Sequence, residues 1–160
     1  MYSDDAYTAW RIDSTIDSVN DVQSALFKNI FTPDEETRKA GLEKYYATTF
    51  PQWCNAIDKR IAHNSSQHHI VGDAVTIADC SLAGFLYGSA YNEGFSVHSQ
   101  LKEVINNYPN LKAYAENLGL HTFKEYLDSR PKPRPFWVQW WDEFKNETKN
   151  LFILLKILNI

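Results

Sequence analysis

Residues 71–91 constrain the fold more than any other part of the chain. The segment VGDAVTIADCSLAGFLYGSAY places a Gly-Asp turn before Thr76-Ile77-Ala78-Asp79, and an almost continuous run of small and apolar residues follows. Thr76 and Asp79 have the spacing of a capping box, in which each side chain accepts a hydrogen bond from the other residue's backbone N–H. Because the run that follows is apolar on nearly every side, we predict a helix at the centre of a bundle.

A catalytic interpretation of the same segment is the alternative, because Asp79 stands near the Thr76 hydroxyl and the Cys80 thiol. Proton transfer requires a carboxylate that is free to exchange its proton. A capping carboxylate is instead held by backbone N–H groups at the positive end of the helix dipole. We therefore assign Thr76 and Asp79 structural roles as the helix N-capping box, and we assign no catalytic residue.

Helical periodicity covers nearly the whole chain. In the first helix, apolar residues recur at three- and four-residue steps with one polar interruption, at Ile12, Ile16, Val19, Gln23, Leu26 and Ile30. Thr32 is predicted to cap the next helix, with Pro33 at its first position and Glu35 completing a capping box. Pro51 is expected to kink or break that helix. No stretch alternates regularly enough to predict a strand, so the predicted fold class is all-α.

The composition excludes several classes of protein. The chain has 160 residues, 44% of them hydrophobic, and a net charge of −4, which argues against a nucleic-acid partner. Its two cysteines, Cys54 and Cys80, form no Cys-x-x-Cys pair, and Cys54 lies in an apolar stripe that predicts a buried thiol. With no secretory signal or membrane-length apolar run in this sequence, we expect a cytoplasmic protein.

The segment Ile70-Val71-Gly72-Asp73-x-x-Thr76-Ile77-Ala78-Asp79 resembles the signature of the C-terminal domain of glutathione S-transferases. Other segments agree with that domain in the expected order, and the set is most similar to its sigma-, pi- or alpha-like members: residues 2–5, 9–13, 50–53, 108–111 and 126–131. The resemblance covers about residues 2–136. It implies an all-helical domain at 1–136, followed by an apolar C-terminal extension at 137–160.

In that family an N-terminal thioredoxin-like half holds glutathione and activates its thiolate, and the helical half supplies the electrophile pocket and much of the dimer interface. The resemblance covers the helical half alone, so the chain is not expected to be catalytic by itself. Tyr2 and Tyr7 do not match the catalytic tyrosine of the other half. Glutathione is implied as a co-substrate if a thioredoxin-like half is supplied elsewhere, and no other cofactor is expected.

Asp13, Asp17 and Asp21 recur at four-residue steps and therefore share one face of the first helix. A solvated acidic face is the simplest interpretation. The family alternative rests on a similar Asp-x-x-x-Asp-x-x-x-Asp pattern in pi-like members, whose third acid reaches the amino group of the partner subunit's glutathione. Asp21 matches that position.

His63, His68 and His69 crowd a polar loop, but no acid or thiol joins them at ligand spacing, so we expect no metal site.

Residues 137–160 continue a helical pattern that becomes apolar all round at Leu151-Phe152-Ile153-Leu154-Leu155. Such a segment is expected to pack back on the bundle, to dock a protein partner or to lie on a membrane. Its mixed charges make the membrane the weakest of these, and a protein contact is the interpretation we favour. A fourth possibility is that these residues come from readthrough past a natural terminus.

Two functions follow from the sequence. The chain is the helical half of a glutathione transferase, as a homodimer or with a partner half, or it is a structural subunit of a larger assembly anchored by this extension.

Overall fold

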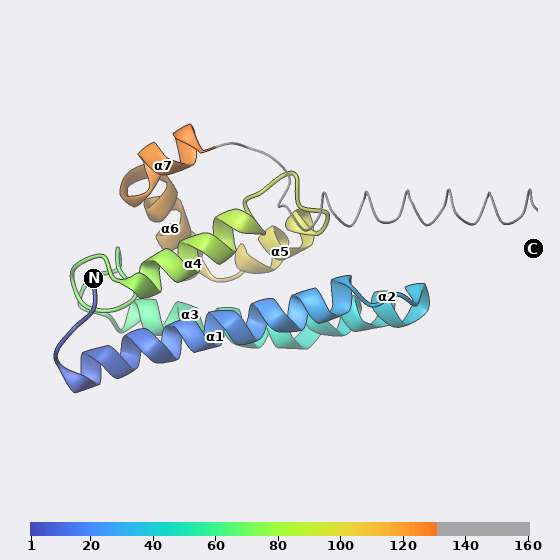
Figure 1. Ribbon diagram of the computed structural model, residues 1–160, viewed down its shortest axis with the longest axis horizontal. Helices are drawn as coiled ribbons and strands as arrows, with labels where there is room; N and C mark the ends of the chain where they lie inside the picture. Colours follow the sequence, from blue (N-terminus) through green and yellow to red (C-terminus); the bar gives the residue numbers. More distant parts are fainter. Residues whose placement is uncertain (131–160) are drawn as a thin grey trace, which may run out of the picture.

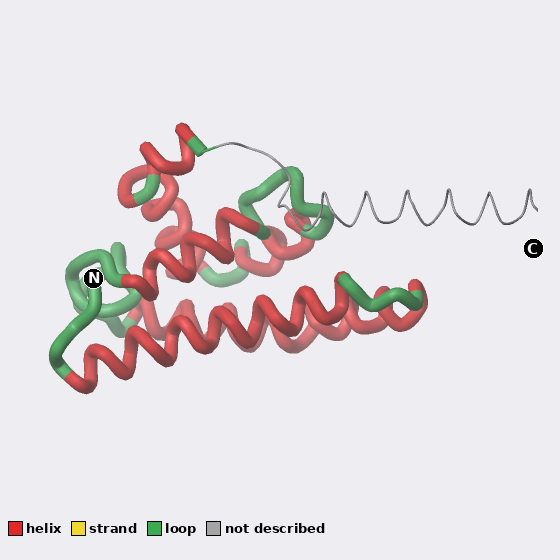
Figure 2. The backbone as a smooth tube through the Cα atoms, viewed as in Figure 1, coloured by secondary structure: helices red, strands yellow, loops and turns green. Residues whose placement is uncertain are grey.

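The computed structural model describes residues 1–130, which form helices joined by loops, with no strand among them (Figures 1 and 2). This confirms the predicted all-α fold class. The elements are α1 (Ala6–Ile30), α2 (Glu35–Lys44), the π-helical segment η1 (Tyr45–Thr49), α3 (Phe50–Ala62), α4 (Ile77–Gly88), α5 (His98–Ile105), α6 (Pro109–Asn117), the π-helical segment η2 (Leu118–Thr122) and α7 (Lys124–Ser129). The predicted extension, residues 137–160, lies outside the described residues.

Helix α1 is the longest element and runs alongside the rod formed by α2, η1 and α3 (Figure 1). Its first turn is capped by Asp5, whose carboxylate accepts a 2.8 Å hydrogen bond from the backbone N–H of Thr8. The buried residues recur at three- and four-residue steps: Ile12, Thr15, Val19, Val22 and Leu26. Ile16 and Gln23, which were predicted in the stripe, lie half-buried at its edge.

The second helix is capped by Asp34 and not by Thr32, which corrects the predicted cap. The Asp34 carboxylate accepts a 2.8 Å hydrogen bond from the backbone N–H of Thr37, and Pro33 precedes this cap. The Thr32 hydroxyl instead donates a 2.8 Å hydrogen bond to the carbonyl of Lys28 at the end of α1. A charged carboxylate is the stronger acceptor at the positive end of a helix, so Asp34 takes the position.

The helix continues through Pro51, where a kink or break was expected. A proline lacks the backbone donor, and its ring clashes with the carbonyl four residues earlier in an α-helix. Here the preceding residues form η1, in which the N–H of Phe50 reaches back to the carbonyl of Tyr45. This wider i→i+5 turn reduces the clash between the Pro51 ring and the earlier carbonyl, so α3 follows η1 without an intervening loop.

Helix α4 packs against α1 and carries the centre of the core. Its buried residues are Ala78, Asp79, Leu82, Ala83, Phe85 and Leu86. An aromatic cluster packs beside it, in which Phe50 stacks on Trp53 at 5.8 Å and Trp53 meets Phe85 edge-on at 5.4 Å. Gly84, by contrast, is exposed, so the apolar run of α4 is not covered on every side by residues 1–130.

The later helices attach to α3 through a cap that comes from another element. Asp58 of α3 accepts hydrogen bonds from the backbone N–H groups of Asn110 (2.8 Å) and Leu111 (3.0 Å), the first free donors of α6. Pro109 opens that helix and has no N–H to offer. Because the donors at a helix start need an external acceptor, Asp58 fixes where α6 begins.

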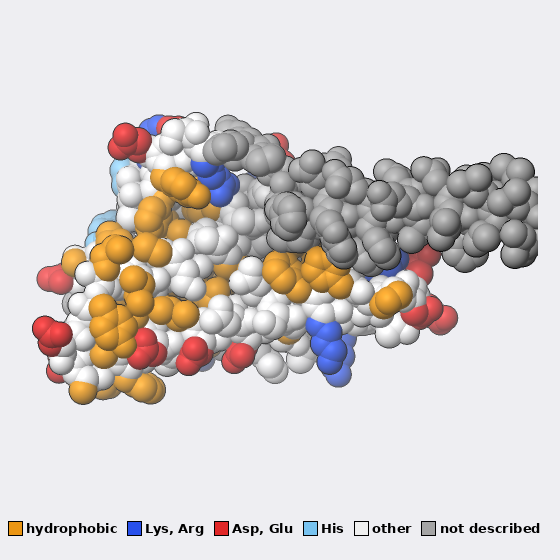
Figure 3. Space-filling view, viewed as in Figure 1, with side chains coloured by type: hydrophobic (Ala, Val, Ile, Leu, Met, Phe, Trp, Pro, Cys, Tyr) orange, Lys and Arg blue, Asp and Glu red, His pale blue; other side chains and the backbone are white. Residues whose placement is uncertain are grey.

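The first residues of the chain lie against the start of α4. The carbonyl of Met1 accepts a 3.1 Å hydrogen bond from the backbone N–H of Ile77. Tyr7 and Trp10, both exposed, stack at 5.8 Å near the start of α1, where Figure 3 shows apolar side chains gathered at the surface. The N-terminus is therefore held beside the central helix.

Candidate functional site

The carboxylate of Asp79 is fully buried and accepts hydrogen bonds from three other residues. Oδ2 accepts from the backbone N–H (2.8 Å) and hydroxyl (2.9 Å) of Thr76, with which Asp79 forms a capping box. Oδ1 accepts from the backbone N–H of Ile70 (3.0 Å) and the hydroxyl of Tyr114 (2.7 Å). A buried carboxylate is tolerated when its lone pairs are satisfied in this way. Asp79 thus ties the preceding loop, α4 and α6 together, and no acceptor position is left for proton transfer.

Tyr114 is held as a hydrogen-bond donor by its surroundings. Burial raises its pKa well above the usual value, and the charge of Asp79 and their hydrogen bond act in the same direction. The phenol therefore keeps its proton at neutral pH. This rules out a tyrosinate at the only buried Tyr–Asp pair among residues 1–130.

The loop between α3 and α4 is organised around the buried side chain of Asn64. Its Nδ2 lies 2.8, 2.8 and 2.6 Å from the carbonyl oxygens of Ser66, His69 and Gly72, and its Oδ1 accepts from the N–H of Gly72 at 3.0 Å. Gly72 has a φ of 70°, a left-handed conformation that suits glycine. The loop is thus a fixed structural element that presents Ile70 to Asp79.

The three histidines of this loop do not converge. His63 and His68 are exposed, and His69 is half-buried. The Nδ1 of His63 lies 2.7 Å from the carbonyl of Lys59 in its own helix. Within the described part of the chain, no group of three or more His, Cys, Asp or Glu side chains could hold a metal ion.

Asp13, Asp17 and Asp21 are all exposed on α1, and Figure 3 shows acidic side chains along this helix. The hydroxyl of Tyr2 donates a 2.7 Å hydrogen bond to Oδ2 of Asp13, and this bond raises the pKa of Tyr2. The Tyr2 hydroxyl thus acts as a hydrogen-bond donor to the acidic face of α1. Asp21 stands two turns further along, accessible to a ligand from solvent.

Neither cysteine is prepared for nucleophilic chemistry. Cys54 is fully buried in α3, and burial raises the pKa of its thiol. Burial and the neighbouring charge of Asp79 also raise the pKa of the Cys80 thiol. Both thiols stay protonated at neutral pH, because a raised pKa disfavours the thiolate.

A cavity of about 200 Å³ opens between α1 and α4, and we call it the α1–α4 groove. Its walls come from α1, from the C-terminal half of α4 and from the loop that follows α4: Gln23, Phe27, Gly84, Phe85, Gly88, Ser89 and Phe95. Three phenylalanines and two glycines make the surface mostly apolar. Concave apolar surfaces with few polar groups are typical of small-molecule sites.

The groove owes its open space to Gly84 and Gly88. Apart from its chain neighbours and the nearby backbone of α4, a Cβ placed on either glycine would meet no atom of the described residues within 4 Å. Ser89 directly follows α4 and its hydroxyl donates to the carbonyl of Phe85 in that helix, so Gln23 is the polar group at the groove. Sequence reasoning missed this site. Two glycines one turn apart in an apolar helix were the signal that could have found it.

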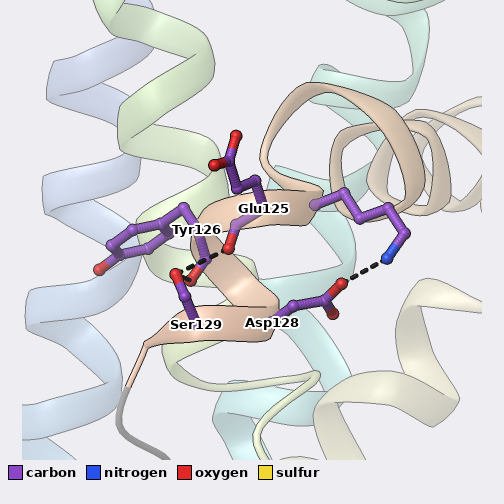
Figure 4. Close-up of polar contacts among 5 residues, drawn as sticks. Glu125, Tyr126, Asp128 and Ser129 are labelled. Carbon is purple, nitrogen blue, oxygen red and sulfur yellow. Dashed lines mark hydrogen bonds and ion pairs between the residues drawn. The ribbon is translucent and has the colours of Figure 1, made fainter.

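Helix α7 closes the described chain on the side of α4. The hydroxyl of Ser129 donates a 2.7 Å hydrogen bond to the carbonyl of Glu125. Figure 4 shows this contact beside the ion pair of Lys124 and Asp128. Arg130 follows in an extended conformation and is half-buried. Some of the carbonyl groups at the C-terminus of α7 therefore accept hydrogen bonds, at the point where the described residues end.

The family model described as the glutathione S-transferase, C-terminal domain, matches residues 20–130. The chain belongs to this family. The glutathione S-transferase helical domain accounts for the all-α bundle, and the match includes α4 with its capping box as well as both sides of the α1–α4 groove. Asp21 falls inside the matched range, on α1 but outside the residues that line the groove.

Among solved structures, the chain is similar to prostaglandin synthase D of Nilaparvata lugens, with a TM-score of 0.67 and 21% identity. The similarity covers 83% of this chain and 62% of that one, so this glutathione S-transferase domain spans less than two thirds of the other protein's length. At this identity the likeness shows the fold alone. No curated protein matches the sequence. No helix within residues 1–130 is long and apolar enough to cross a membrane.

Proposed function

We propose that this domain serves as the helical half of a glutathione transferase, contributing an apolar pocket for the electrophilic co-substrate and a surface for dimerisation. The observation that carries the proposal is the α1–α4 groove, an apolar cavity in a domain of this family. Its Phe27, Phe85 and Phe95 rings suit an aromatic or aliphatic electrophile, and Gln23 offers one polar contact to orient it.

The same proposal makes the helical domain non-catalytic by itself. Activation of glutathione requires a group that stabilises its thiolate. The buried hydroxyl of Tyr114 is bound to Asp79, and the hydroxyl of Tyr2 is bound to Asp13. We expect the thiolate-stabilising group to come from a thioredoxin-like half, and residues 1–130 contain no strand from which such a half could be built.

Asp21 is the residue proposed to contact glutathione. Its exposed carboxylate on α1 suits a charge-assisted hydrogen bond to an amino group held by a second subunit. Dimerisation through the α1 face would place one such carboxylate from each copy at the other copy's ligand. We propose the cytoplasm as the compartment, because Cys54 and Cys80 are not joined in a disulfide and a reducing compartment suits such a pair.

The first experiment is glutathione conjugation of a generic aromatic electrophile by the purified chain, with glutathione-affinity capture in parallel. We expect no turnover and no retention. A thioredoxin-like half supplied in trans is expected to restore both. Turnover by the chain alone would contradict the division of labour between the two halves.

The second candidate function is a structural subunit of a larger assembly, and the apolar sequence of residues 137–160 favours it. A stoichiometric large partner that co-purifies through this extension would support the structural subunit. A dimer that binds hydrophobic electrophiles without such a partner would support the transferase half.

A further inference from the structure

We propose that Arg11 and Arg60 form a binding site for the dianionic phosphate group of a small phosphate monoester. The site lies where the start of α1 meets the end of α3. Arg11 and Gln23, a residue of the α1–α4 groove, are twelve residues apart on α1, which is roughly 18 Å at 1.5 Å per residue. The two sites are therefore separate, and the phosphate site stands whether or not the groove binds an electrophile.

Arg60, in the last turn of α3, is held against α1 by two hydroxyl groups. Its Nη1 donates to Oγ1 of Thr15 at 2.6 Å and to Oγ of Ser14 at 3.3 Å. Both hydroxyls donate in turn to the carbonyl of Arg11, at 2.7 and 3.1 Å respectively. Arg60 is thus fixed to the turn of α1 that begins at Arg11. Its Nε and Nη2 donors have no acceptor among residues 1–130.

The side chain of Arg11 lies close to that of Arg60. Nη2 of Arg11 approaches the carbonyl oxygen of Ile70, in the loop that follows α3, at 3.5 Å. Burial lowers the pKa of Arg60, and the charge of Arg11 acts in the same direction. Arginine nevertheless stays protonated at neutral pH, so two positive charges face one another at a half-buried position. We call these two residues the arginine pair.

The arginine pair has no counter-ion in the described part of the chain. Neither guanidinium forms an ion pair with an acid of residues 1–130. Acids on or beside the same helices are engaged elsewhere: Asp5 caps α1, Asp13 accepts from Tyr2, and Asp58 caps α6. Because like charges at short distance repel, an anion placed between the two guanidiniums would be stabilised by both.

The free N–H groups of the arginine pair are open to a ligand. Three buried side-chain atoms lack a hydrogen-bond partner among residues 1–130, and none of them belongs to an arginine: Tyr46 Oη, Trp53 Nε1 and His69 Nδ1. The donors of Arg11 and Arg60 that have no partner therefore reach the solvent. A ligand can contact them without any rearrangement of the bundle.

A phosphate dianion matches the arginine pair in charge and in geometry. Its two negative charges balance two guanidiniums, and each guanidinium can donate a fork of two hydrogen bonds to phosphate oxygens. The protein as a whole has a net charge of −4, so general attraction of anions does not account for binding here. The ligand class is therefore set by the local pair.

Two exposed aromatic rings beside the arginine pair favour a monoester over free phosphate. Tyr7 lies one turn before Arg11 on α1 and is close enough to Arg60 to influence its pKa. Tyr7 stacks on Trp10 at 5.8 Å, and both rings are exposed. They offer a flat apolar surface to the organic group that carries the phosphate. We therefore expect the tightest ligands to carry a planar ring.

The test is calorimetric titration of the full chain with phenyl phosphate, in chloride buffer of constant ionic strength so that screening is equal throughout. We expect one site with a dissociation constant in the millimolar range. Arg11→Gln and Arg60→Gln should each weaken binding about fivefold or more, because each removes one charged fork. Equal affinities of these variants and the unmodified chain, or no binding to the unmodified chain, would overturn the proposal.

Arg38→Gln is the matched control, because it changes the net charge equally at another place. Arg38 is also half-buried and donates a 3.1 Å hydrogen bond to the carbonyl of Thr32. Its replacement should leave the affinity for phenyl phosphate within about twofold of the unmodified chain. A loss as large as that of Arg60→Gln would show general charge attraction and would overturn the site.

A second measurement uses the unmodified chain, in case a variant fails to fold. The Nε–H resonances of Arg11 and Arg60 should shift on titration with phenyl phosphate and should saturate together. Those of Arg38 and of Arg130, which donates to the carbonyl of Tyr87, should stay in place. Equal shifts of all four arginines without saturation would contradict a site at the arginine pair.

The choice of ligand separates a monoester from other anions. Phenyl phosphate should bind about threefold or more tightly than inorganic phosphate, and Trp10→Ala should remove this advantage. Phenyl sulfate carries the same ring with one charge fewer at neutral pH and should bind severalfold more weakly than phenyl phosphate. Equal affinities for phenyl phosphate and inorganic phosphate would overturn the assignment to a monoester and point to free phosphate. Equal affinities for the two phenyl esters would overturn the requirement for a dianion.

Discussion

The hydroxyl of Tyr114 lies 2.7 Å from Oδ1 of Asp79, so the carboxylate that caps the start of α4 also binds α6. The two residues are 35 positions apart in the chain. A capping box alone is a local device that satisfies donors within one turn. Here the second carboxylate oxygen extends it into a contact between elements, which makes Asp79 a link between α4, the loop that precedes it and α6.

Replacing Asp79 should therefore cost far more than replacing an ordinary cap. In Asp79→Asn an amide NH₂ group faces donors that need an acceptor, and we expect the free energy of unfolding to fall by about 2–4 kcal/mol. Urea denaturation followed by circular dichroism measures the loss. Asp17→Asn, on the exposed face of α1, is the control and should change it by less than about 0.5 kcal/mol. A loss for Asp79→Asn as small as that of the control would refute the link.

Tyr114→Phe removes the hydroxyl that donates to Asp79, and it should lower the free energy of unfolding by about 1 kcal/mol.

Asp58 should behave as the N-terminal cap of a helix it does not belong to. Asp58→Ala leaves the N–H groups of Asn110 and Leu111 without this acceptor, and the expected loss is about 1–2 kcal/mol in the free energy of unfolding. Hydrogen exchange should accelerate first in α6, because that helix start loses its acceptor. Lys59→Ala, exposed on the same helix, is the control. Uniform acceleration across all helices would speak against a capping role.

The left-handed conformation of Gly72 predicts how this position responds to substitution. Gly72→Ala places a Cβ at a φ of 70° and should cost about 1–2 kcal/mol, although the space around it is open. Gly72→Asn should cost less, because asparagine tolerates this region better. Thermal unfolding of the two variants checks the order. Equal losses would show that contact with Asn64, and not backbone strain, decides the effect.

Tyr46 should make the protein sensitive to alkali. Burial raises its pKa from the usual value of 10.0 to about 12, and its hydroxyl has no hydrogen-bond partner among the atoms of residues 1–130. Between these values the unfolded chain releases the proton while the folded protein retains it, so stability is intact below pH 10 and falls as the pH rises toward 12. Tyr46→Phe should keep the neutral-pH stability and flatten this decline. Tyr126 is exposed, so Tyr126→Phe should leave the decline of stability with pH unchanged. The same decline in both variants would contradict the assignment of this effect to Tyr46.

The glutathione contact proposed for Asp21 has its own test. In a dimer reconstituted with a thioredoxin-like half, Asp21→Ala removes a charge-assisted hydrogen bond, and glutathione affinity should fall about tenfold. Asp17→Ala, one turn earlier, should leave the affinity unchanged. Calorimetric titration of glutathione measures both. Unchanged affinity in Asp21→Ala would leave the acidic residues of α1 as a solvated face.

Helical periodicity and the Thr76–Asp79 spacing were sufficient to predict the fold class and the central helix, because these signals are local. The partners of Asp79 in the loop and in α6 were not predictable in this way, since Ile70 and Tyr114 reach it only after the chain has folded. Thr32 failed as a cap because a stronger acceptor, Asp34, stands two residues later. The α1–α4 groove escaped detection because it consists of space left by glycines, and an apolar pattern does not distinguish a covered helix face from an open one.

The two ends of the described chain are fastened to the two ends of one helix. Met1 is bound at the first residue of α4, and Arg130 at the last turn. Ile77 and Tyr87 are ten residues apart in α4, so a rise of 1.5 Å per residue puts these two points roughly 15 Å apart. A donor dye at the N-terminus and an acceptor dye just beyond Arg130 would therefore form a built-in molecular ruler, whose energy transfer reports on a single helix at the heart of the domain.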